Sequence, residues 1–231
     1  MEKEVEIQKK AIVFIDGNNW YHNSKQVIDT KHISFIKLAN FICDHYKYKL
    51  EQIRYYNSIP DISENELKYY QHMEFLSRLE KEGIKVFKRK LQKNSNKDAL
   101  NERGMIVDSL VLCEKCKPIA KENCVNCLGN VSKKEKGIDV KIAVDMIRKC
   151  LIENECDICI LVSGDADFIP AILTIRDANK EVITSSVFPG YSNELRSGKF
   201  RYFPLTKSNL NKYCMKDYNT VKKDKEFTNR E

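Results

Sequence analysis

Two short apolar runs, each ended by a polar turn, constrain the fold of this chain more than any other feature. Residues 11–15 (Ala-Ile-Val-Phe-Ile) precede Asp16, and residues 158–162 (Ile-Cys-Ile-Leu-Val) precede the turn Ser163-Gly164-Asp165. Runs of this length without polar alternation suit parallel strands that are covered on both faces. The spacing of apolar residues in the segments between and after these runs predicts helices and strands in alternation. This order predicts a three-layer α/β/α sandwich with a mainly parallel sheet.

The other elements follow from the spacing of apolar residues. We expect further strands at 53–59, 84–91 and 181–187, and helices at 33–46, 64–81, 140–151, 170–178 and 193–200. Residues 92–135 break this rhythm, so we interpret them as an insert within one domain that covers residues 8–205. Residues 206–231 are mostly polar and predict a disordered tail. No Gly-x-Gly-x-x-Gly and no Walker loop follows the first strand, which argues against a dinucleotide-binding or P-loop protein.

Aspartates gather where the carboxyl edge of the sheet is expected. Asp16, Asp165 and Asp167 follow strands, and Asp139 stands where another strand would end and a helix begins. Ligands of open α/β sheets bind at this edge. Grouped carboxylates repel one another unless a cation shares them, and oxygen ligands suit Mg²⁺ or Mn²⁺. We therefore expect a divalent-metal site that hydrolyses phosphodiesters. Each aspartate alone could instead be a turn residue or a helix cap.

Three further polar residues belong to this interpretation. Asn19 and Ser163 lie on the same expected rim, where each either holds a carboxylate or a metal-bound water, or closes its own turn. Asp145 is six residues beyond Asp139, which is about 120° around a helix, so it does not share a tight site with Asp139. We interpret Asp145 as a helper or a structural residue.

The chain has nine cysteines, and six of them occur in CxxC pairs. Two pairs lie in the insert and predict one tetrahedral, structural Zn²⁺ bound by Cys113, Cys116, Cys124 and Cys127. The alternatives for these two pairs are redox-active or idle thiols. The third pair, Cys156 and Cys159, enters an apolar strand, and we interpret both as buried thiols.

The chain has a net charge of +7, which favours an anionic partner and nucleic acid first. Basic residues beside the insert cysteines could bind a phosphate backbone. The same segment could instead contact a second subunit in a homodimer, or could only stabilise a long loop. Other basic residues could face the cleft from two expected strand ends. The nucleic-acid-binding set that we expect is Lys88, Lys90, Lys115, Lys117, Lys121, Arg196 and Lys199.

The sequence also bears on the compartment. No apolar run approaches the roughly 18 residues of a membrane-spanning helix. The first residues are charged and lack the apolar centre of a signal peptide. We therefore expect a cytoplasmic protein that does not contact a membrane.

Four motifs in order resemble one known family. They are residues 14–19 (Phe-Ile-Asp-Gly-Asn-Asn), 136–140 (Lys-Gly-Ile-Asp-Val), 143–146 (Ala-Val-Asp-Met) and 163–168 (Ser-Gly-Asp-Ala-Asp-Phe). Together they resemble the NYN domain, the LabA-like branch of the PIN-like nuclease superfamily, over about residues 8–205. The cysteine-bearing insert departs from the plain family pattern.

The resemblance implies a PIN-like fold and a metal-dependent ribonuclease, which we expect to be an endoribonuclease. It implies an acidic site made of Asp16, Asp139, Asp165 and Asp167, with Asn19 and Ser163 adjacent. RNA as the partner, in preference to DNA, rests on the resemblance, whereas interleaved aromatic and basic residues such as Phe87-Lys88-Arg89-Lys90 favour a single strand. The alternatives are a catalytically inactive RNA-binding or scaffold protein with the same fold, a DNA nuclease, and a phosphatase.

Overall fold

A six-stranded parallel sheet forms the centre of the molecule. The computed structural model describes residues 8–60, 62, 65–90, 92–93, 96–125, 133–134, 137–188 and 190–217. The strand order is β3-β2-β1-β6-β7-β8, and every neighbouring pair is parallel. The strands are β1 (Lys10–Asp16), β2 (Lys49–Ile59), β3 (Lys85–Lys90), β6 (Ile158–Val162), β7 (Glu181–Val187) and β8 (Arg201–Leu205).

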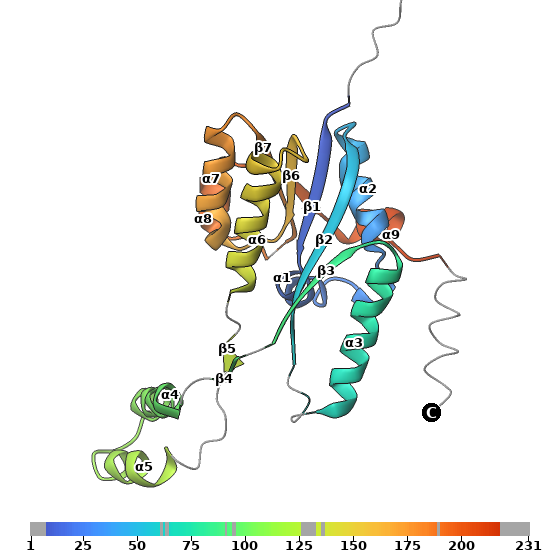
Figure 1. Ribbon diagram of the computed structural model, residues 1–231. Coiled ribbons are helices and arrows are strands. Elements are labelled where there is room, and N and C mark those ends of the chain that lie inside the picture. The colour runs from blue at the N-terminus through green and yellow to red at the C-terminus, as the bar shows by residue number, and fades with distance from the viewer. Residues whose placement is uncertain are drawn as a thin grey trace, which may run out of the picture.

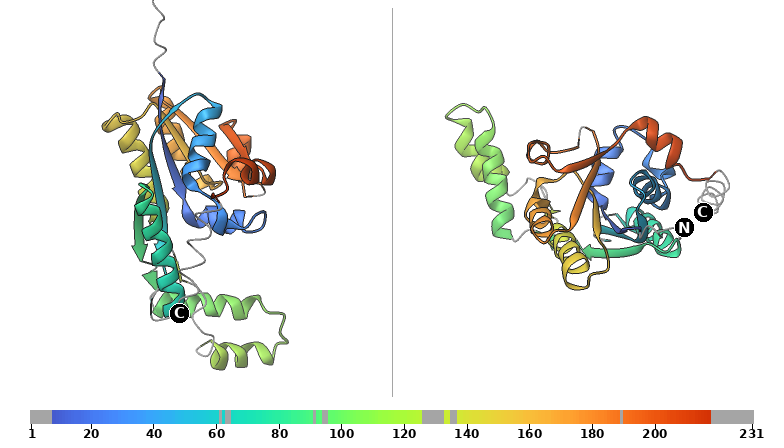
Figure 2. Two further views of the ribbon diagram at one scale, coloured as in Figure 1. Left: turned by 90° about the vertical axis from the view of Figure 1, so that its right-hand side faces the viewer. Right: turned by 90° about the horizontal axis from the view of Figure 1, so that it is seen from above.

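Helices cover both faces of this sheet (Figures 1 and 2). One layer holds α1 (Gly17–Ser24), α2 (Phe35–His45), α3 (Glu66–Lys81) and α9 (Lys207–Tyr213). The other holds α6 (Ile138–Ile147), α7 (Ile169–Asp177) and α8 (Asn193–Ser197). Three short turns complete this part: η1 (Thr30–His32), the π-helical η2 (Arg148–Ile152) and η3 (Ala166–Phe168). The predicted three-layer α/β/α sandwich is confirmed.

Strand β1 explains why its sequence is apolar without alternation. Val13 and Ile15 pack into the α1–α2–α3 layer, whereas Ile12 and Phe14 pack into the α6–α7 layer. All four side chains are buried. Removing each of them from water stabilises the fold by about 1.5–3 kcal/mol. Residues 11–15 of the strand therefore offer no solvent-facing position at which a polar residue would be tolerated.

The C-terminal part differs from the prediction. Strand β8 was not predicted, and α9 lies in the segment expected to be disordered. Leu210 and Cys214 are buried, and the Thr206 side chain and Asn209 form a capping box at the start of α9. The expected disordered tail is therefore wrong for residues 206–217, because tertiary packing supports a helix whose few apolar residues give no periodic signal. Residues 218–231 lie outside the described residues.

The insert contains two further helices, α4 (Asn96–Ser109) and α5 (Cys116–Cys124), which we call the arm. The short antiparallel strands β4 (Gln92–Lys93) and β5 (Lys133–Lys134) pair at its base. The arm projects from the body of the molecule (Figure 2). Because the chain leaves the sheet at the end of β3 and returns at the start of α6, the base of the arm lies at the carboxyl edge.

None of the helices in the described part of the chain combines the length and the apolar character that a membrane span requires.

Candidate metal and nucleic-acid site

The strand order places a switch point between β1 and β6. From β1 the chain continues to β2 and β3 on one side, and from β6 it continues to β7 and β8 on the other. The connections that follow β1 and β6 therefore diverge, and ligands of such sheets bind in the crevice between them. Asp16 is the last residue of β1, and Ser163 follows β6 directly. The two residues meet at this switch point.

Asp16 is held between these two strand ends. The residue is 4% exposed. The Oδ1 atom accepts a hydrogen bond from the backbone N–H of Asn19 at 3.1 Å and thereby caps α1. The Oδ2 atom accepts a hydrogen bond from the Ser163 hydroxyl at 3.2 Å. A carboxylate fixed through both oxygens has a defined direction at the rim of the sheet.

Asn19 and Ser163 tie α1 to the turn after β6. The Asn19 side-chain oxygen accepts hydrogen bonds from the Gly164 backbone N–H at 3.0 Å and from the Asn23 amide at 2.9 Å. The Ser163 hydroxyl, which donates to Asp16, also accepts from the backbone N–H of Asp165 at 3.3 Å. Of the roles expected for Ser163, the contact with a carboxylate is therefore present. Asn23 was missed because a single Asn in a helix carries no signal.

Asp165 and Asp167 share the turn beside Ser163. The Asp165 Oδ1 atom accepts a hydrogen bond from the backbone N–H of Asp167 at 3.0 Å and caps η3. Asp165 is half-buried and Asp167 is exposed. Gly164 permits this turn to approach its neighbour, because a Cβ atom there would lie 1.7 Å from the carbonyl oxygen of Gly190. Both carboxylates therefore lie on the rim that Asp16 enters from β1.

Asp139 reaches the same edge from a helix and not from a strand. It lies in the first turn of α6, whose N-cap is Gly137 in the left-handed region at φ 82°. The expectation that Asp139 ends a strand of the sheet is wrong, because α6 begins at Ile138. Helix α6 packs against β1 and η3, so its N-terminus lies at the switch-point edge. Arg89, at the end of β3, donates to the Gly137 carbonyl at 3.4 Å and flanks this turn.

The carboxylates fit a hydrated cation better than a closed cage. Among the described residues, no three carboxylates bring their oxygen atoms within 4.8 Å of one another. Mg²⁺ usually keeps several waters and contacts only one or two carboxylates directly. The oxygen donors of Asp16, Asp139, Asp165 and Asp167 therefore suit Mg²⁺ or Mn²⁺, with the remaining ligand positions left to water or phosphate.

Asp145 has a different environment, although it lies on the same helix as Asp139. It is 4% exposed and accepts hydrogen bonds from Arg54 at 2.8 Å, Tyr56 at 2.8 Å and Lys141 at 2.6 Å. Burial by itself would raise the pKa of Asp145, but these donors outweigh it and hold the pKa below the usual range. This network joins α6 to β2. Of the two expected roles, it corresponds to the structural one.

The predicted basic residues divide between the two edges of the sheet. Lys90 is exposed at the carboxyl end of β3, whereas the Lys88 ammonium forms an ion pair with Glu80 at 2.8 Å. Arg196 donates to the Tyr191 carbonyl at 3.3 Å, beyond the carboxyl end of β7. Lys199 instead lines a pocket with Arg201 at the amino edge, where β8 begins. The expectation that Lys199 faces the cleft is therefore wrong.

Two aromatic side chains near the carboxyl edge are exposed, and each has a cation over its ring. Tyr21 of α1 is 52% exposed, with the Lys25 ammonium 5.4 Å from its ring centre. Phe188, directly after β7, is 66% exposed, with the Arg196 guanidinium 5.3 Å from its ring centre. Such pairs suit the stacking of unpaired bases beside phosphates. Phe188 has no distinguishing signal in the sequence, because isolated apolar residues after a strand are common.

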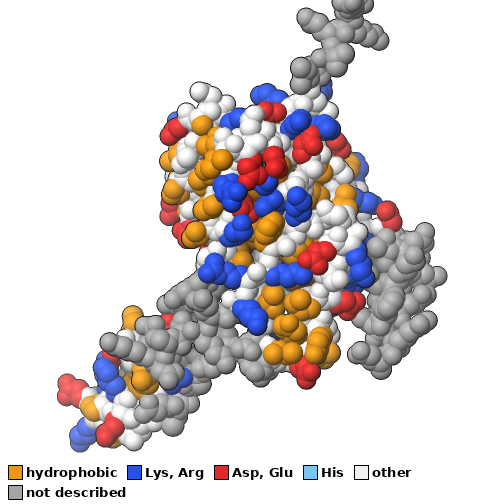
Figure 3. All heavy atoms as spheres, in the orientation of Figure 1, with side chains coloured by type: hydrophobic (Ala, Val, Ile, Leu, Met, Phe, Trp, Pro, Cys, Tyr) orange, Lys and Arg blue, Asp and Glu red, His pale blue; other side chains and the backbone are white. Residues whose placement is uncertain are grey.

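The basic charge of the chain is dispersed on the face that carries β2, β3 and α6. There, Lys and Arg side chains are interspersed with acidic ones (Figure 3). In the arm, the Lys121 ammonium pairs with Asp108 at 2.9 Å, and the Lys117 ammonium donates to the Asp108 carbonyl at 3.1 Å. The hydrogen bond from Lys121 holds the pKa of Asp108 below its usual value. Two of the three predicted arm lysines therefore also join α5 to α4, while Lys115 is exposed.

The described residues hold only part of the predicted zinc site in the arm. Cys113 and Cys116 are exposed and adjacent at the start of α5, and Cys124 is its last residue. A helix rises by about 1.5 Å per residue, so the backbones of Cys116 and Cys124 are about 12 Å apart. The sulfur ligands of one zinc lie only about 4 Å apart, which this helix does not allow. Cys127 lies outside the described residues, so the zinc site stays a prediction that requires α5 to shorten.

Comparison with known proteins gives the family. None of the curated proteins compared with the chain matches it. The fold is similar to the crystal structure of a protein of unknown function from Vibrio parahaemolyticus, with a TM-score of 0.53 and 17% identity over 89% of this chain and 96% of that one. The model of the NYN domain matches residues 10–206. This match covers both aspartate-bearing strand ends, the start of α6 and the sheet, so the chain belongs to the NYN domain family, whose members have a PIN-like nuclease fold.

Proposed function

We propose that this protein is a metal-dependent ribonuclease that cleaves single-stranded RNA at the carboxyl edge of its sheet. The observation that carries the proposal is the connection of Asp16, at the end of β1, to the turn that holds Asp165 and Asp167. Ser163 makes this connection through one hydroxyl, which donates to Asp16 and accepts from Asp165. Membership of the NYN family supports a nuclease acting on RNA.

Each acidic residue has a part that follows from its surroundings. Asp16 is buried and fixed through both oxygens, so it would provide a well-positioned oxygen ligand for a Mg²⁺ or Mn²⁺ ion. Asp165 and Asp167 are more exposed and can bind the ion directly or through water. Asp139 would close the site from the N-terminus of α6, whose dipole also favours a phosphate there. An ion held by these carboxylates would lower the pKa of a water and would stabilise charge on the phosphate.

The surroundings of the site favour a single strand over a duplex. Tyr21 with Lys25 and Phe188 with Arg196 offer two exposed rings, each beside a cation. Bases can stack on such rings only when they are unpaired. We therefore propose that the RNA strand passes between α1 and the loop after β7. Its bases would stack on these two rings, and the phosphate to be cleaved would lie at Asp16.

Cleavage of matched RNA and DNA strands tests this function. Both substrates are incubated with the protein in Mg²⁺, Mn²⁺ or chelator. We expect cleavage of RNA that requires the metal, and a loss of at least about 100-fold in Asp16→Asn and in Asp165→Asn, because a lost metal ligand removes several kcal/mol of transition-state stabilisation. Asp177→Asn, an exposed position at the far end of α7, is the control and keeps full activity.

The outcomes separate the alternatives. Full activity of both aspartate variants would show that the metal site lies elsewhere. Metal-independent RNA binding without cleavage would identify an inactive RNA-binding or scaffold protein. Equal cleavage of both strands would identify a nuclease without preference for RNA, and release of phosphate from monoesters alone would identify a phosphatase.

A further inference from the structure

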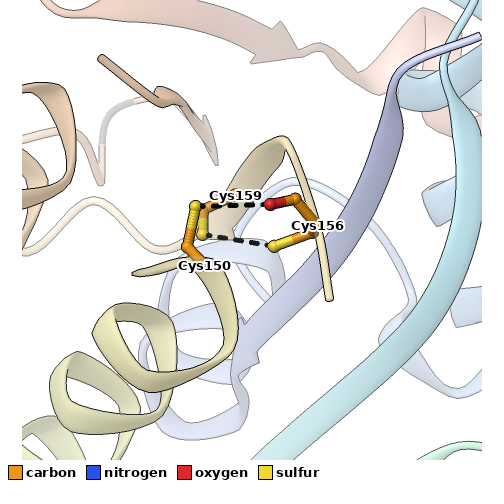
Figure 4. Close-up of side chains that lie close together, drawn as sticks. All are labelled: Cys150, Cys156 and Cys159. Carbon is orange, nitrogen blue, oxygen red and sulfur yellow. Dashed lines mark hydrogen bonds between the residues drawn. The ribbon is translucent and has the colours of Figure 1, made fainter. Parts of the chain in front are cut away.

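Three cysteines that are separated in the sequence meet inside the protein. Cys150, Cys156 and Cys159 are each at most 1% exposed. Their sulfur atoms all lie within 4.8 Å of one another, and the sulfurs of Cys156 and Cys159 are 3.9 Å apart (Figure 4). The group lies at the amino end of β6, at the opposite edge of the sheet from the carboxylates. The proposed ribonuclease site therefore does not use it.

Local structure brings the three thiols together. Cys159 lies in β6 and faces the α6 layer, in which its thiol is 3.8 Å from the Met146 carbonyl oxygen. After Ile147, α6 widens into the π turn η2, and Cys150 is the central residue of that turn. Turns of this type are rare and often mark functional sites. The chain then reverses through Asn154, in the left-handed region at φ 50°, and returns to Cys156.

The spacing of the sulfurs matches a metal centre. A metal ion at about 2.3 Å from each of three thiolates in one plane places the sulfurs about 4 Å apart. The separation of Cys156 and Cys159 is 3.9 Å, and Cys150 needs to move by less than an ångström or so to complete the triangle. The other two buried cysteines in the described chain, Cys43 and Cys214, belong to no such group.

We propose that Cys150, Cys156 and Cys159 form a binding site for a thiophilic metal ion, with Cu⁺ as the fitting ion. Thiolates select soft ions such as Cu⁺ and Zn²⁺. In the described residues no histidine, carboxylate or further cysteine joins the three as a fourth ligand. Zn²⁺ is almost always four-coordinate in structural sites, whereas Cu⁺ is satisfied by three sulfurs. Each metal–sulfur bond replaces an S–H bond, and the proton leaves to solvent.

The surroundings provide charge compensation and access. The Lys180 ammonium donates to the Cys156 carbonyl at 3.2 Å and to the Asn154 side chain at 2.8 Å, so a positive charge lies beside the thiolates, although Asp157 shares it through an ion pair at 3.4 Å. Residues 152–155, which precede Cys156, are exposed. An ion would enter past this exposed segment, because it directly precedes Cys156 in the chain.

Competition for Cu⁺ tests the site in the full-length chain. The parent protein carries serine at all four cysteines of the insert, so that these do not bind the ion. It is refolded anaerobically with Cu⁺ and titrated with a coloured Cu⁺ chelator. We expect one Cu⁺ per chain and an affinity at least about tenfold lower after Cys150→Ala. Cys43→Ala, which removes an equally buried but isolated thiol, is the control and leaves the affinity unchanged.

A second measurement guards against misfolding of the variant. Because a ligand of the native state raises the unfolding midpoint, Cu⁺ should raise it in the parent and in Cys43→Ala, but not in Cys150→Ala. Absence of Cu⁺ binding, or equal affinity in Cys150→Ala, would overturn the proposal. Binding of Zn²⁺ without Cu⁺ would overturn the choice of ion. A disulfide between Cys156 and Cys159 in freshly purified protein would show that the group is a redox pair instead.

Discussion

Replacing Asp145 by Asn removes a buried negative charge while keeping the shape of the side chain. Three groups donate to this carboxylate: the Arg54 guanidinium and the Tyr56 hydroxyl, each at 2.8 Å, and the Lys141 ammonium at 2.6 Å. The side chains of Asp145 and Arg54 are each only 6% exposed. The N–H groups of the Asn amide would face other hydrogen-bond donors in place of a carboxylate oxygen. The buried Arg54 guanidinium would also lose the anion that neutralises its charge.

The structure sets the size of this effect. Leaving one partner of a buried ion pair uncompensated costs about 3–5 kcal/mol. Arg54 keeps part of its environment, because it stacks on the Phe87 ring at 4.4 Å and donates to Gln52 at 2.6 Å. A cation–π contact of this kind offsets about 1 kcal/mol. We therefore expect Asp145→Asn to lower the free energy of unfolding by about 2–4 kcal/mol, or the Tm by about 5–15 °C for a domain of this size.

Urea unfolding followed by fluorescence measures this change directly. The chain has a single tryptophan, and Trp20 is buried in the core beside α2. Because the hydrogen bonds hold the pKa of Asp145 below its usual range, the stabilisation is fully present above about pH 4 and is lost as the pH falls through the lower value in the folded protein. The difference between wild type and Asp145→Asn should therefore shrink below about pH 4.

Two results would refute this reasoning. One is an Asp145→Asn protein as stable as wild type at pH 7. The other is a stability difference that stays unchanged at acid pH. A triple variant, Asp145→Leu with Arg54→Met and Tyr56→Phe, provides the complementary test: replacing the network by apolar groups should recover most of the lost stability, because no buried charge or hydroxyl is then left unpaired.

Three further predictions concern the arm and the proposed RNA path. Protein purified without chelator should carry one zinc per chain, and the double variant Cys113→Ser with Cys116→Ser should lose it. Zinc should also lower the helical far-UV circular dichroism signal, since α5 must shorten to bind it. Metal analysis that finds no zinc would contradict the predicted site. Lys121→Ala should make the arm more sensitive to protease, because it removes the ion pair with α4, while the Tm of the α/β body stays the same; an unchanged digestion pattern would contradict this. Tyr21→Ala and Phe188→Ala should each weaken binding of single-stranded RNA by about 1–3 kcal/mol without changing duplex binding, as measured by fluorescence anisotropy; equal losses for both RNA forms would argue against stacking.

The sequence alone determined most of the elements and part of the site. The apolar run before Asp16 and the one before Ser163 identified two central strands, since a strand buried on both faces tolerates no polar side chain. Periodic spacing identified the helices that cover the sheet. It could not identify α9, because seven residues with few apolar anchors give no periodic signal and depend on packing for their stability.

Only the tertiary structure decided which residues from different elements lie next to one another. Strand order placed Asp16 beside Ser163 at one switch point and brought Asp139 to the same edge from a helix. Strand direction decided that Lys199 lies at the opposite edge. The π turn after α6 carried Cys150 to the CxxC pair that the sequence showed only as two buried thiols. The pattern of apolar residues in a segment indicates which side chains of that element are buried. Contacts between elements depend on strand order and helix packing, which no single segment encodes.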